Sequence, residues 1–114
     1  GHVVGDEVLR NSARLIASRL RESDVFARYG GEEFVILMPG VSLASACNTA
    51  EQIRNAIENE GTKLMIKMTI SIGVTERETD EHLDNWLKRT DSAMYQAKAN
   101  GRNCVICGKS RIFS

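Results

Sequence analysis

The chain has 114 residues, of which 42% are hydrophobic and 26% charged, and its 15 basic and 15 acidic side chains cancel at pH 7. These values are typical of one globular domain and exclude an overall field that would draw the chain to nucleic acid or a membrane surface. No apolar run approaches the roughly 20 residues of a membrane-spanning helix, so we expect no direct membrane contact.

The first half of the chain predicts a helix, a hairpin of two strands and a second helix. In "GDEVLRNSARLIASRLR" apolar residues recur at three- and four-residue steps, with Gly5 and Asp6 where an N-cap belongs. The stretch "DVFARYGGEEFVILMP" predicts two strands joined by a tight two-residue turn at Gly30 and Gly31. Residues 34–38 are apolar on both faces, which indicates a strand covered on both sides, and residues 42–58 predict the second helix.

The second half predicts a strand, a third helix and a terminal strand. From Leu64 to Val74 apolar residues alternate with polar ones, which is typical of a half-buried strand. Residues 80–100 predict a helix that buries apolar residues including Leu83, and Gly101 is placed as its C-cap. The stretch "CVIC" closes the chain, so the expected order is α-β-β-α-β-α-β.

The three cysteines, Cys47, Cys104 and Cys107, are odd in number and do not make a disulfide framework. Cys104 and Cys107 have C-x-x-C spacing, but side chains three apart on a strand point to opposite faces. No second cysteine pair or histidine cluster completes a zinc site. We therefore expect reduced cysteines that serve as apolar strand residues in a cytoplasmic protein.

The stretch "RYGGEEF", residues 28–34, places two glycines and two carboxylates directly before an apolar strand. Gly30 and Gly31 would let a phosphate approach the backbone, while Glu32 and Glu33 offer the hard oxygen ligands that Mg²⁺ prefers. The alternative is a solvated turn whose glutamates face water or pair with Arg28. The motif is too short to decide between a phosphate and metal site and a simple turn.

Other candidate residues also have a purely structural interpretation when each is taken alone. Asp6 at a helix start and Lys98 in a last helical turn both suit the helix ends without a ligand. Arg21 and Asp24, three residues apart, are spaced for an ion pair at a helix end. Arg102, which follows Gly101, is compatible with plain surface exposure.

Taken together, "GHVVGDEVLR", "RESD", "RYGGEEF", "TISIGV", "DSAMYQAK" and "GRN" resemble, in order and spacing, the GGDEF domain of diguanylate cyclases. The resemblance covers the whole chain, and "GGEEF" is an accepted form of the signature. It implies one α/β (α+β) domain over residues 1–114, with a ferredoxin-like nucleotidyl-cyclase (palm-type) sheet and flanking helices. It also implies a homodimer that condenses two GTP molecules into cyclic di-GMP and two pyrophosphates.

The resemblance assigns roles to individual residues. Glu32 matches the position that binds Mg²⁺ (or Mn²⁺) and accepts a proton, and Glu33 the adjoining acid that supports the metal and phosphates. Asp6 matches the residue that accepts hydrogen bonds from the guanine edge. The remaining substrate contacts implied for GTP are His2, Gly30, Gly31, Lys98 and Arg102.

"RESD" resembles the inhibitory R-x-x-D site that binds the product, cyclic di-GMP. Arg21 and Asp24 would form this site, with Arg54 as a candidate for a companion arginine. An alternative within the same family is a non-catalytic module that binds cyclic di-GMP as a sensor, and a further one is a structural dimerisation domain.

Family members begin with a strand that bears a metal-binding aspartate and lies inside the sheet, followed by a helix with a guanine-binding asparagine. Both would precede Gly1, so we expect the domain to be N-terminally incomplete and this chain by itself to have little cyclase activity. Unpaired backbone groups on the apolar strands would then promote association or strand exchange.

Overall fold

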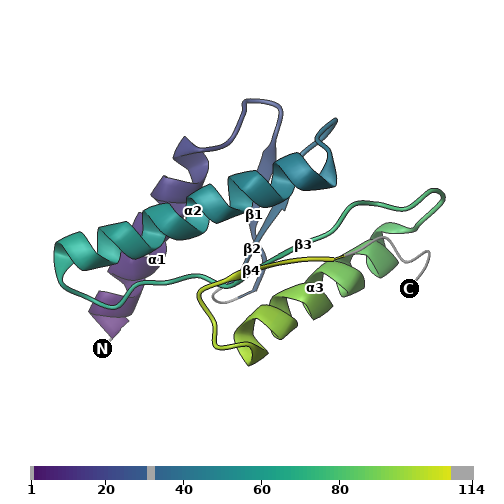
Figure 1. The fold of residues 1–114 in the computed structure, drawn as a ribbon. Helices are drawn as coiled ribbons and strands as arrows, with labels where there is room; N and C mark the ends of the chain where they lie inside the picture. The colour runs from purple at the N-terminus through teal and green to yellow at the C-terminus, as the bar shows by residue number, and fades with distance from the viewer. Residues whose placement is uncertain (1, 31–32, 109–114) are drawn as a thin grey trace. The chain divides into compact units, whose positions relative to one another are not determined.

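The computed structural model describes residues 2–30 and 33–108, and side chains from residue 5 onward. Its helices and strands follow the order α-β-β-α-β-α-β, which confirms the expected order (Figure 1). The chain forms two compact units, Gly1–Val41 and Ser42–Ser114, which are described separately. None of the helices in the described residues is long and apolar enough to cross a membrane.

The first unit contains one helix and one β-hairpin. Helix α1 spans His2–Ser18, and strands β1 (Val25–Arg28) and β2 (Phe34–Leu37) pair antiparallel. The hairpin is held by the backbone ladder and by the rings of Phe26 and Phe34, whose centroids lie 5.3 Å apart.

Three expectations for this unit are wrong in detail. Because α1 already begins at His2, Asp6 lies inside the helix and does not cap it, and the interior Gly5 costs such a helix only about 1 kcal/mol. The hairpin turn is also wider than two residues, since the ladder ends at the pair Arg28 and Phe34 and the Tyr29 N–H donates to the Glu33 carbonyl at 2.7 Å. The residues of β2 are half-buried, whereas the sequence predicted a strand covered on both faces.

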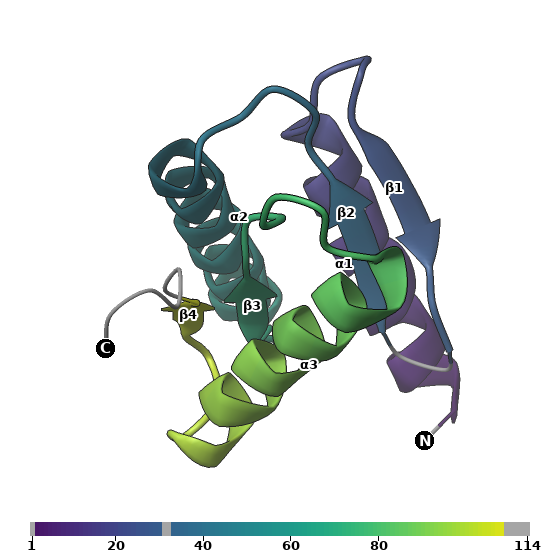
Figure 2. The same cartoon turned by 90° about the vertical axis from the view of Figure 1, so that its right-hand side faces the viewer.

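The second unit contains two helices and a parallel pair of strands. Helix α2 (Leu43–Leu64) begins at Ser42, whose hydroxyl accepts the Ser45 N–H at 3.2 Å. Strands β3 (Ile72–Val74) and β4 (Val105–Cys107) lie side by side, and α3 (Leu83–Ala99) connects them (Figure 2). Buried side chains form the core of the unit: Ala50, Ile53, Ile57, Met68, Ala93 and Ala97.

Most of the alternating stretch, residues 64–74, does not form a strand, since β3 is limited to Ile72–Val74. Helix α2 continues to Leu64 and ends at Met65, which is left-handed (φ 59°) and donates its N–H to the Thr62 carbonyl at 3.1 Å. Met68 is buried (2% exposed), but Ile66 is 37% exposed, so the apolar alternation does not mark one covered face. Gly61 leaves room for Met68 to pack against the helix, since a Cβ on Gly61 would lie 2.6 Å from the Met68 Cβ.

Three further expectations change in this unit. Leu83 is 56% exposed because it is the first residue of α3, outside the helix face that packs inward. The C-cap of α3 is Asn100, and Gly101 is the next residue, with φ 105°. Among the described residues the strands make two two-stranded sheets, where the sequence predicted a single sheet.

A disulfide between Cys47 and Cys107 joins α2 to β4, with 6.2 Å between the two Cα atoms. The expectation that all three cysteines are reduced is therefore wrong for this pair. Helix packing brings together residues that are 60 positions apart, and no local spacing predicts such a pairing. Cys104 is free and its thiol donates to the Ala97 carbonyl at 3.4 Å.

Helix α3 packs directly on β3 at Gly73. A Cβ added to Gly73 would lie 2.6 Å from the Thr90 carbonyl oxygen and 2.8 Å from the Ala93 carbonyl carbon. Only a residue without a side chain allows the backbones of strand and helix to come this close.

The segment between β3 and α3 is anchored by Glu81 and Arg89. Arg89 donates to both carboxylate oxygens of Glu81 at 2.7 Å and to the Glu76 carbonyl at 2.6 Å. The Glu81 carboxylate also accepts the Glu78 N–H at 3.0 Å. The hydrogen bonds from Arg89, followed by the Glu78 N–H, lower the pKa of Glu81 to about 2.

We expect Gly73→Ala to lower the free energy of unfolding of the second unit by roughly 1–3 kcal/mol, because overpacking forces the helix backbone to shift. Urea unfolding followed by circular dichroism measures the change. Gly5→Ala is the control, since that helical glycine has no atom within 4 Å of an added Cβ. Equal unfolding midpoints for Gly73→Ala and wild type would contradict the close approach.

The lowered pKa of Glu81 predicts a pH-dependent contribution to stability. A carboxylate whose folded pKa is about 2, below the ordinary 4.5, stabilises the fold above pH 4.5 and loses that contribution as the pH falls towards 2. Arg89→Gln should lower the melting temperature at pH 6, and its difference from wild type should shrink towards pH 2. The exposed neighbour Lys88, changed to Gln, is the control; a difference for Arg89→Gln that does not vary with pH would contradict the prediction.

Candidate functional site

The turn between β1 and β2 carries the signature residues that the structure describes. Gly30 has φ 83°, in the left-handed region that favours glycine, and is exposed. Glu33 is half-buried, and its carbonyl closes the turn by accepting the Tyr29 N–H. Gly31 and Glu32 lie outside the described residues. The described part of this turn therefore offers exposed glycine backbone and one carboxylate.

Arg21 and Asp24 form a compact pair ahead of β1. The Arg21 guanidinium donates to Asp24 Oδ1 through Nη2 at 2.6 Å and Nε at 3.1 Å, and the Arg21 N–H donates to Asp24 Oδ2 at 2.7 Å. A further Nη2 bond, 2.8 Å long, reaches the Pro39 carbonyl. The Asp24 side chain is fully covered, whereas 48% of the Arg21 side chain is exposed.

The electrostatics of this pair follow from those contacts. Hydrogen bonding from Arg21 holds the pKa of Asp24 below its usual value, and the same bond raises the pKa of Arg21. Asp24 therefore stays ionised and fixes the arginine, while the exposed part of the guanidinium remains available to a ligand. The structure shows the Arg21–Asp24 ion pair that the three-residue spacing indicated, and binding of cyclic di-GMP by this pair stays a prediction.

Asp6 and His2 are both in α1. Asp6 is exposed and has no hydrogen-bond or ion-pair partner among the described residues. His2 begins the helix, but its side chain lies outside the description. The helix thus presents Asp6 to solvent, where a carboxylate is free to accept hydrogen bonds.

Glu33 is the described carboxylate of the signature turn that could contribute to a cation site. Glu33 supplies a hard oxygen donor, and Mg²⁺ usually needs only one or two protein carboxylates in addition to substrate phosphates and water. Within residues 2–30 and 33–108 no three His, Cys, Asp or Glu side chains cluster in a way that would hold a metal ion alone. The described donor fits a metal shared with a phosphate ligand and does not fit a closed protein cage.

Lys98 and Arg102 lie at the C-terminal end of α3, in the second unit. Lys98 is half-buried in the last turn of the helix, and Arg102 is exposed in the turn that follows. Gly101, Arg102 and Asn103 have φ values of 105°, 64° and 47°, so three consecutive residues are left-handed. The Arg102 N–H donates to the Ala97 carbonyl at 3.0 Å, which ties the turn to the helix.

A network from α2 holds this turn on its other side. Arg54 Nη1 donates to Glu58 Oε1 at 3.1 Å and to Asn103 Oδ1 at 3.0 Å, and Asn103 Nδ2 donates to Glu58 Oε2 at 2.7 Å. Arg54 also pairs with Glu51. The Arg54 guanidinium is thus bonded within the second unit, where it positions Asn103. The sequence did not predict this role for Arg54, the candidate companion arginine of the R-x-x-D site.

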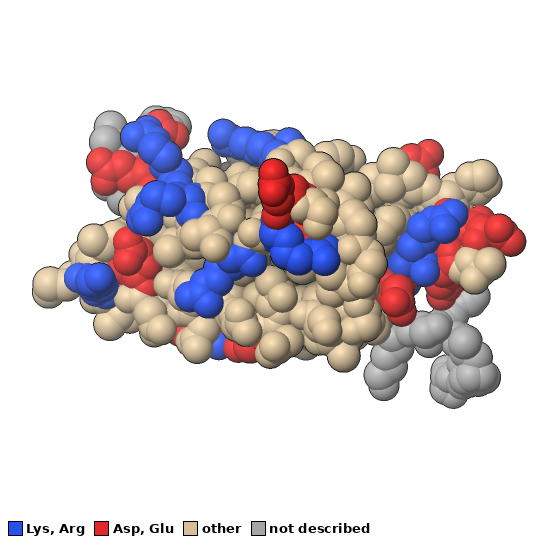
Figure 3. Space-filling model, turned by 90° about the horizontal axis from the view of Figure 1, so that it is seen from above, with Lys and Arg blue, Asp and Glu red and all other residues tan. Residues whose placement is uncertain are grey.

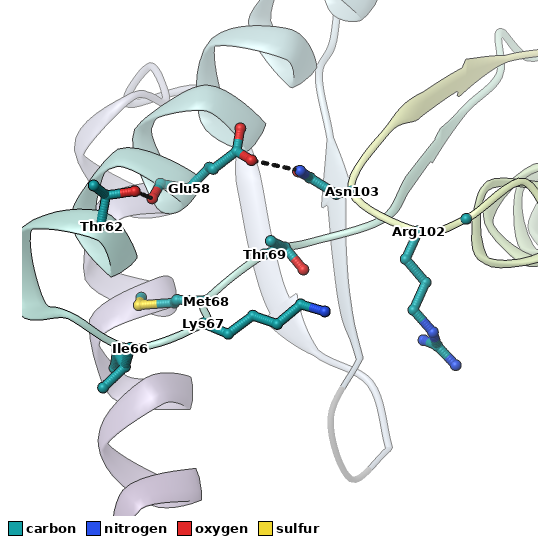
Figure 4. Close-up of a pocket in the computed structure, with 9 residues that line it drawn as sticks. Glu58, Thr62, Ile66, Lys67, Met68, Thr69, Arg102 and Asn103 are labelled. Atoms are coloured by element: carbon teal, nitrogen blue, oxygen red, sulfur yellow. Dashed lines mark hydrogen bonds between the residues drawn. The ribbon is translucent and has the colours of Figure 1, made fainter.

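A pocket of about 340 Å³ opens beside this turn (Figure 4). Lys67, Thr69 and Arg102 line it, and the Lys67 side chain extends along it towards the Arg102 side. The sequence alone indicates no role for Lys67 or Thr69. Its alternation of apolar and polar residues places both on the polar face opposite Met68, and this pattern is the feature of the sequence that could have drawn attention to them.

The face drawn in Figure 3 shows no patch of a single charge sign. Basic and acidic side chains are interspersed there among uncharged ones. This distribution agrees with the zero net charge, so any anion binding depends on local groups such as those in the pocket.

One family of known proteins matches most of this chain. The family described as "Diguanylate cyclase, GGDEF domain" matches residues 1–104. Response regulator PleD of Caulobacter vibrioides is 47% identical over 115 residues, and diguanylate cyclase DgcM of Escherichia coli is 43% identical over 106 residues. Each alignment covers 93% of this chain but only 25% and 26% of the respective relative, so the chain spans about a quarter of their length.

A solved structure shows the same fold. The GGDEF domain of DgcB from Caulobacter crescentus, in complex with c-di-GMP, superposes with a TM-score of 0.88 at 33% identity, covering 96% of this chain and 66% of that one. Family match, sequence identity and superposition agree with one another. The chain belongs to the GGDEF domain family of diguanylate cyclases.

Proposed function

We propose that this domain condenses two GTP molecules into cyclic di-GMP with release of two pyrophosphates. The observation that carries the proposal is the "GGEEF" signature on the β1–β2 turn, with Gly30 left-handed at its start. The similarity to DgcM, which is named a diguanylate cyclase, supports the same reaction. In that reaction each 3′-hydroxyl attacks the α-phosphate of the other nucleotide.

In this proposal the signature turn handles the reacting phosphate. Glu32 accepts the proton of the attacking hydroxyl and would hold Mg²⁺ (or Mn²⁺), and Glu33 is the adjoining acid that supports the metal and phosphate site. The metal would neutralise phosphate charge at the reacting centre. Gly30 and Gly31 offer backbone to the phosphates, and the left-handed Gly30 leaves that approach free of a side chain.

The other proposed substrate contacts come from α1 and from the end of α3. Asp6 accepts from the N1 and N2 donors of guanine, which distinguishes guanine from adenine, and His2 contacts the substrate. Lys98 and Arg102 neutralise the charge that develops on the leaving pyrophosphate. Two such domains would face each other as a homodimer, in the cytoplasm where GTP is available.

We further propose that Arg21 and Asp24 bind cyclic di-GMP as a feedback site. Asp24 already orients the guanidinium, so the arginine loses little freedom when it engages a phosphate or the guanine O6 and N7 atoms. The DgcB domain, 33% identical, was solved with c-di-GMP. The same pair also supports the second candidate function, a sensor that binds cyclic di-GMP without making it.

A graft tests the cyclase reaction. The segment that directly precedes the matched region of DgcM is fused ahead of Gly1, to supply the leading strand and helix with which family members begin. We expect the graft to form cyclic di-GMP from GTP and Mg²⁺, and Glu32→Gln to reduce turnover at least ~10²-fold, because a preorganised electrostatic group is lost.

Product formation is measured by chromatography at saturating GTP, with Glu22→Gln as a matched control outside the signature. An inactive graft that still binds cyclic di-GMP would favour the sensor. Wild-type turnover by Glu32→Gln would contradict the assigned role.

Binding by the R-x-x-D pair can be tested on the 114-residue chain itself. A bidentate arginine–guanine contact contributes ~1–3 kcal/mol, so Arg21→Ala should weaken cyclic di-GMP binding by roughly five- to more than a hundredfold in calorimetric titration. Arg19→Ala removes the same charge nearby and should bind like wild type. Circular dichroism checks the fold of each variant, and equal affinity for Arg21→Ala and wild type would limit the pair to a structural role.

A further inference from the structure

The Cys47–Cys107 disulfide has no part in the proposed cyclase reaction, and its two ends differ in exposure. Cys47 is half-buried near the start of α2, and Cys107 is the exposed last residue of β4. The two Cα atoms are 6.2 Å apart, within the range of ordinary disulfides. A reagent in solution therefore reaches the bond at Cys107 first.

The disulfide fastens the C-terminal end of β4, which has few other ties. Among the described residues β4 pairs with β3 alone, and the Gly108 N–H that follows donates to the Val74 carbonyl at 2.7 Å. Before β4, Asn103 bonds with Arg54 and Glu58 of α2. Helix α2 thus holds this last segment at two points, by hydrogen bonds at its start and by the disulfide at its end.

The core of the second unit does not depend on β4. Its buried side chains come from α2, α3 and the segment before β3, whereas Val105 and Ile106 of β4 are only half-buried. Release of β4 from α2 would therefore leave the core packed. Opening of the bond is then a local event at the end of the chain's last strand, because few buried contacts oppose it.

A thiolate in solution opens such a bond by thiol–disulfide exchange. The thiolate sulfur forms a new S–S bond with the Cys107 sulfur, the Cys47–Cys107 bond breaks, and Cys47 leaves as a thiolate that takes a proton from water. A second molecule of the same thiol attacks the mixed disulfide, which leaves a free Cys107 thiol and a disulfide of the two small thiols. The reverse steps close the bond again, with that small disulfide as the oxidant.

We propose that the Cys47–Cys107 bond is a reversible modification site, at which a low-molecular-mass thiol such as glutathione becomes attached to Cys107 and β4 is released from α2. A domain that uses GTP works among such thiols, where a protein disulfide is rare and usually serves redox sensing. This setting rests on the proposed function, whereas the exchange chemistry does not. Cys104 is not needed, because its thiol donates to the Ala97 carbonyl and side chains three apart on a strand point to opposite faces.

The first test measures exchange on the folded 114-residue chain in mixtures of reduced and oxidised glutathione, with thiols alkylated and mapped by mass spectrometry. Cys47→Ser isolates Cys107, and Cys107→Ser isolates Cys47. Cys107 should take up glutathione at least about tenfold faster than Cys47, because it is exposed and Cys47 is half-buried. Cys104→Ser is the matched control and should open and close its disulfide like wild type.

The second test compares the oxidised and reduced chains by amide hydrogen exchange and thermal melting. Reduction should lower the protection of Gly108 and of the β4 amides at least about tenfold, while Ile57 in α2 keeps its protection. The melting temperature should fall by roughly 10 °C, because the bond closes a long loop and its loss returns freedom to the unfolded chain. Cys107→Ser should show the same lower melting temperature with and without thiol.

The proposal is overturned if protein prepared without reductant has all three thiols free, or if glutathione opens the bond only in denaturant. Equal uptake by Cys47→Ser and Cys107→Ser would also overturn it, as would unchanged protection of β4 after reduction. Loss of protection throughout the second unit would make the bond a structural one. None of these measurements involves turnover, so an inactive graft would remove the proposed function and leave the thiol exchange standing.

Discussion

The close approach of α3 to β3 at Gly73 sets the geometry of the second unit. Because no side chain separates strand from helix there, the backbone of α3 around Thr90 and Ala93 lies against the strand. The end of α3 is then fixed, and the turn that follows it must return β4 to pair in parallel with β3. The placement of the exposed arginine at that turn is a consequence of this packing.

Left-handed backbone at three successive residues is unfavourable unless neighbouring groups hold it. Gly101 takes this conformation at little cost, Asn103 tolerates it better than most residues, and Arg102 does not. Asn103 is secured by Arg54 and Glu58 from α2, 45 or more positions earlier in the sequence. The network therefore has two effects: it neutralises Glu58, and it keeps the turn in a form that leaves Arg102 exposed beside the pocket.

The residues to which the family resemblance assigns roles divide between the two units. Arg21, Asp24 and Glu33 belong to the first unit, and Lys98 and Arg102 to the second. The proposed cyclic di-GMP site at Arg21 and Asp24 and the proposed substrate contacts Lys98 and Arg102 thus belong to separate units of the chain.

Part of the candidate site followed from the sequence. The "RESD" spacing is compatible with an ion pair, and Arg21 and Asp24 do pair, because a turn in which the Asp24 N–H donates to the Arg21 carbonyl brings them within reach of each other. The role of Arg54 did not follow, because its partner Asn103 lies 49 positions away and only the packing of α2 beside the last turn joins them. In the sequence, Lys67 is one polar residue of an alternating stretch. Its place in the pocket lining follows only from the structure, in which the neighbouring Met68 is buried.

By itself the sequence determined the order of helices and strands, the family and the signature turn, since apolar periodicity and local motifs depend on near neighbours along the chain. Tertiary structure alone decided that α2 continues to Leu64 and that β3 is limited to Ile72–Val74. It also decided the Cys47–Cys107 bond. These features depend on contacts between distant segments, such as Gly61 against Met68, whose free energy is not encoded in any local pattern.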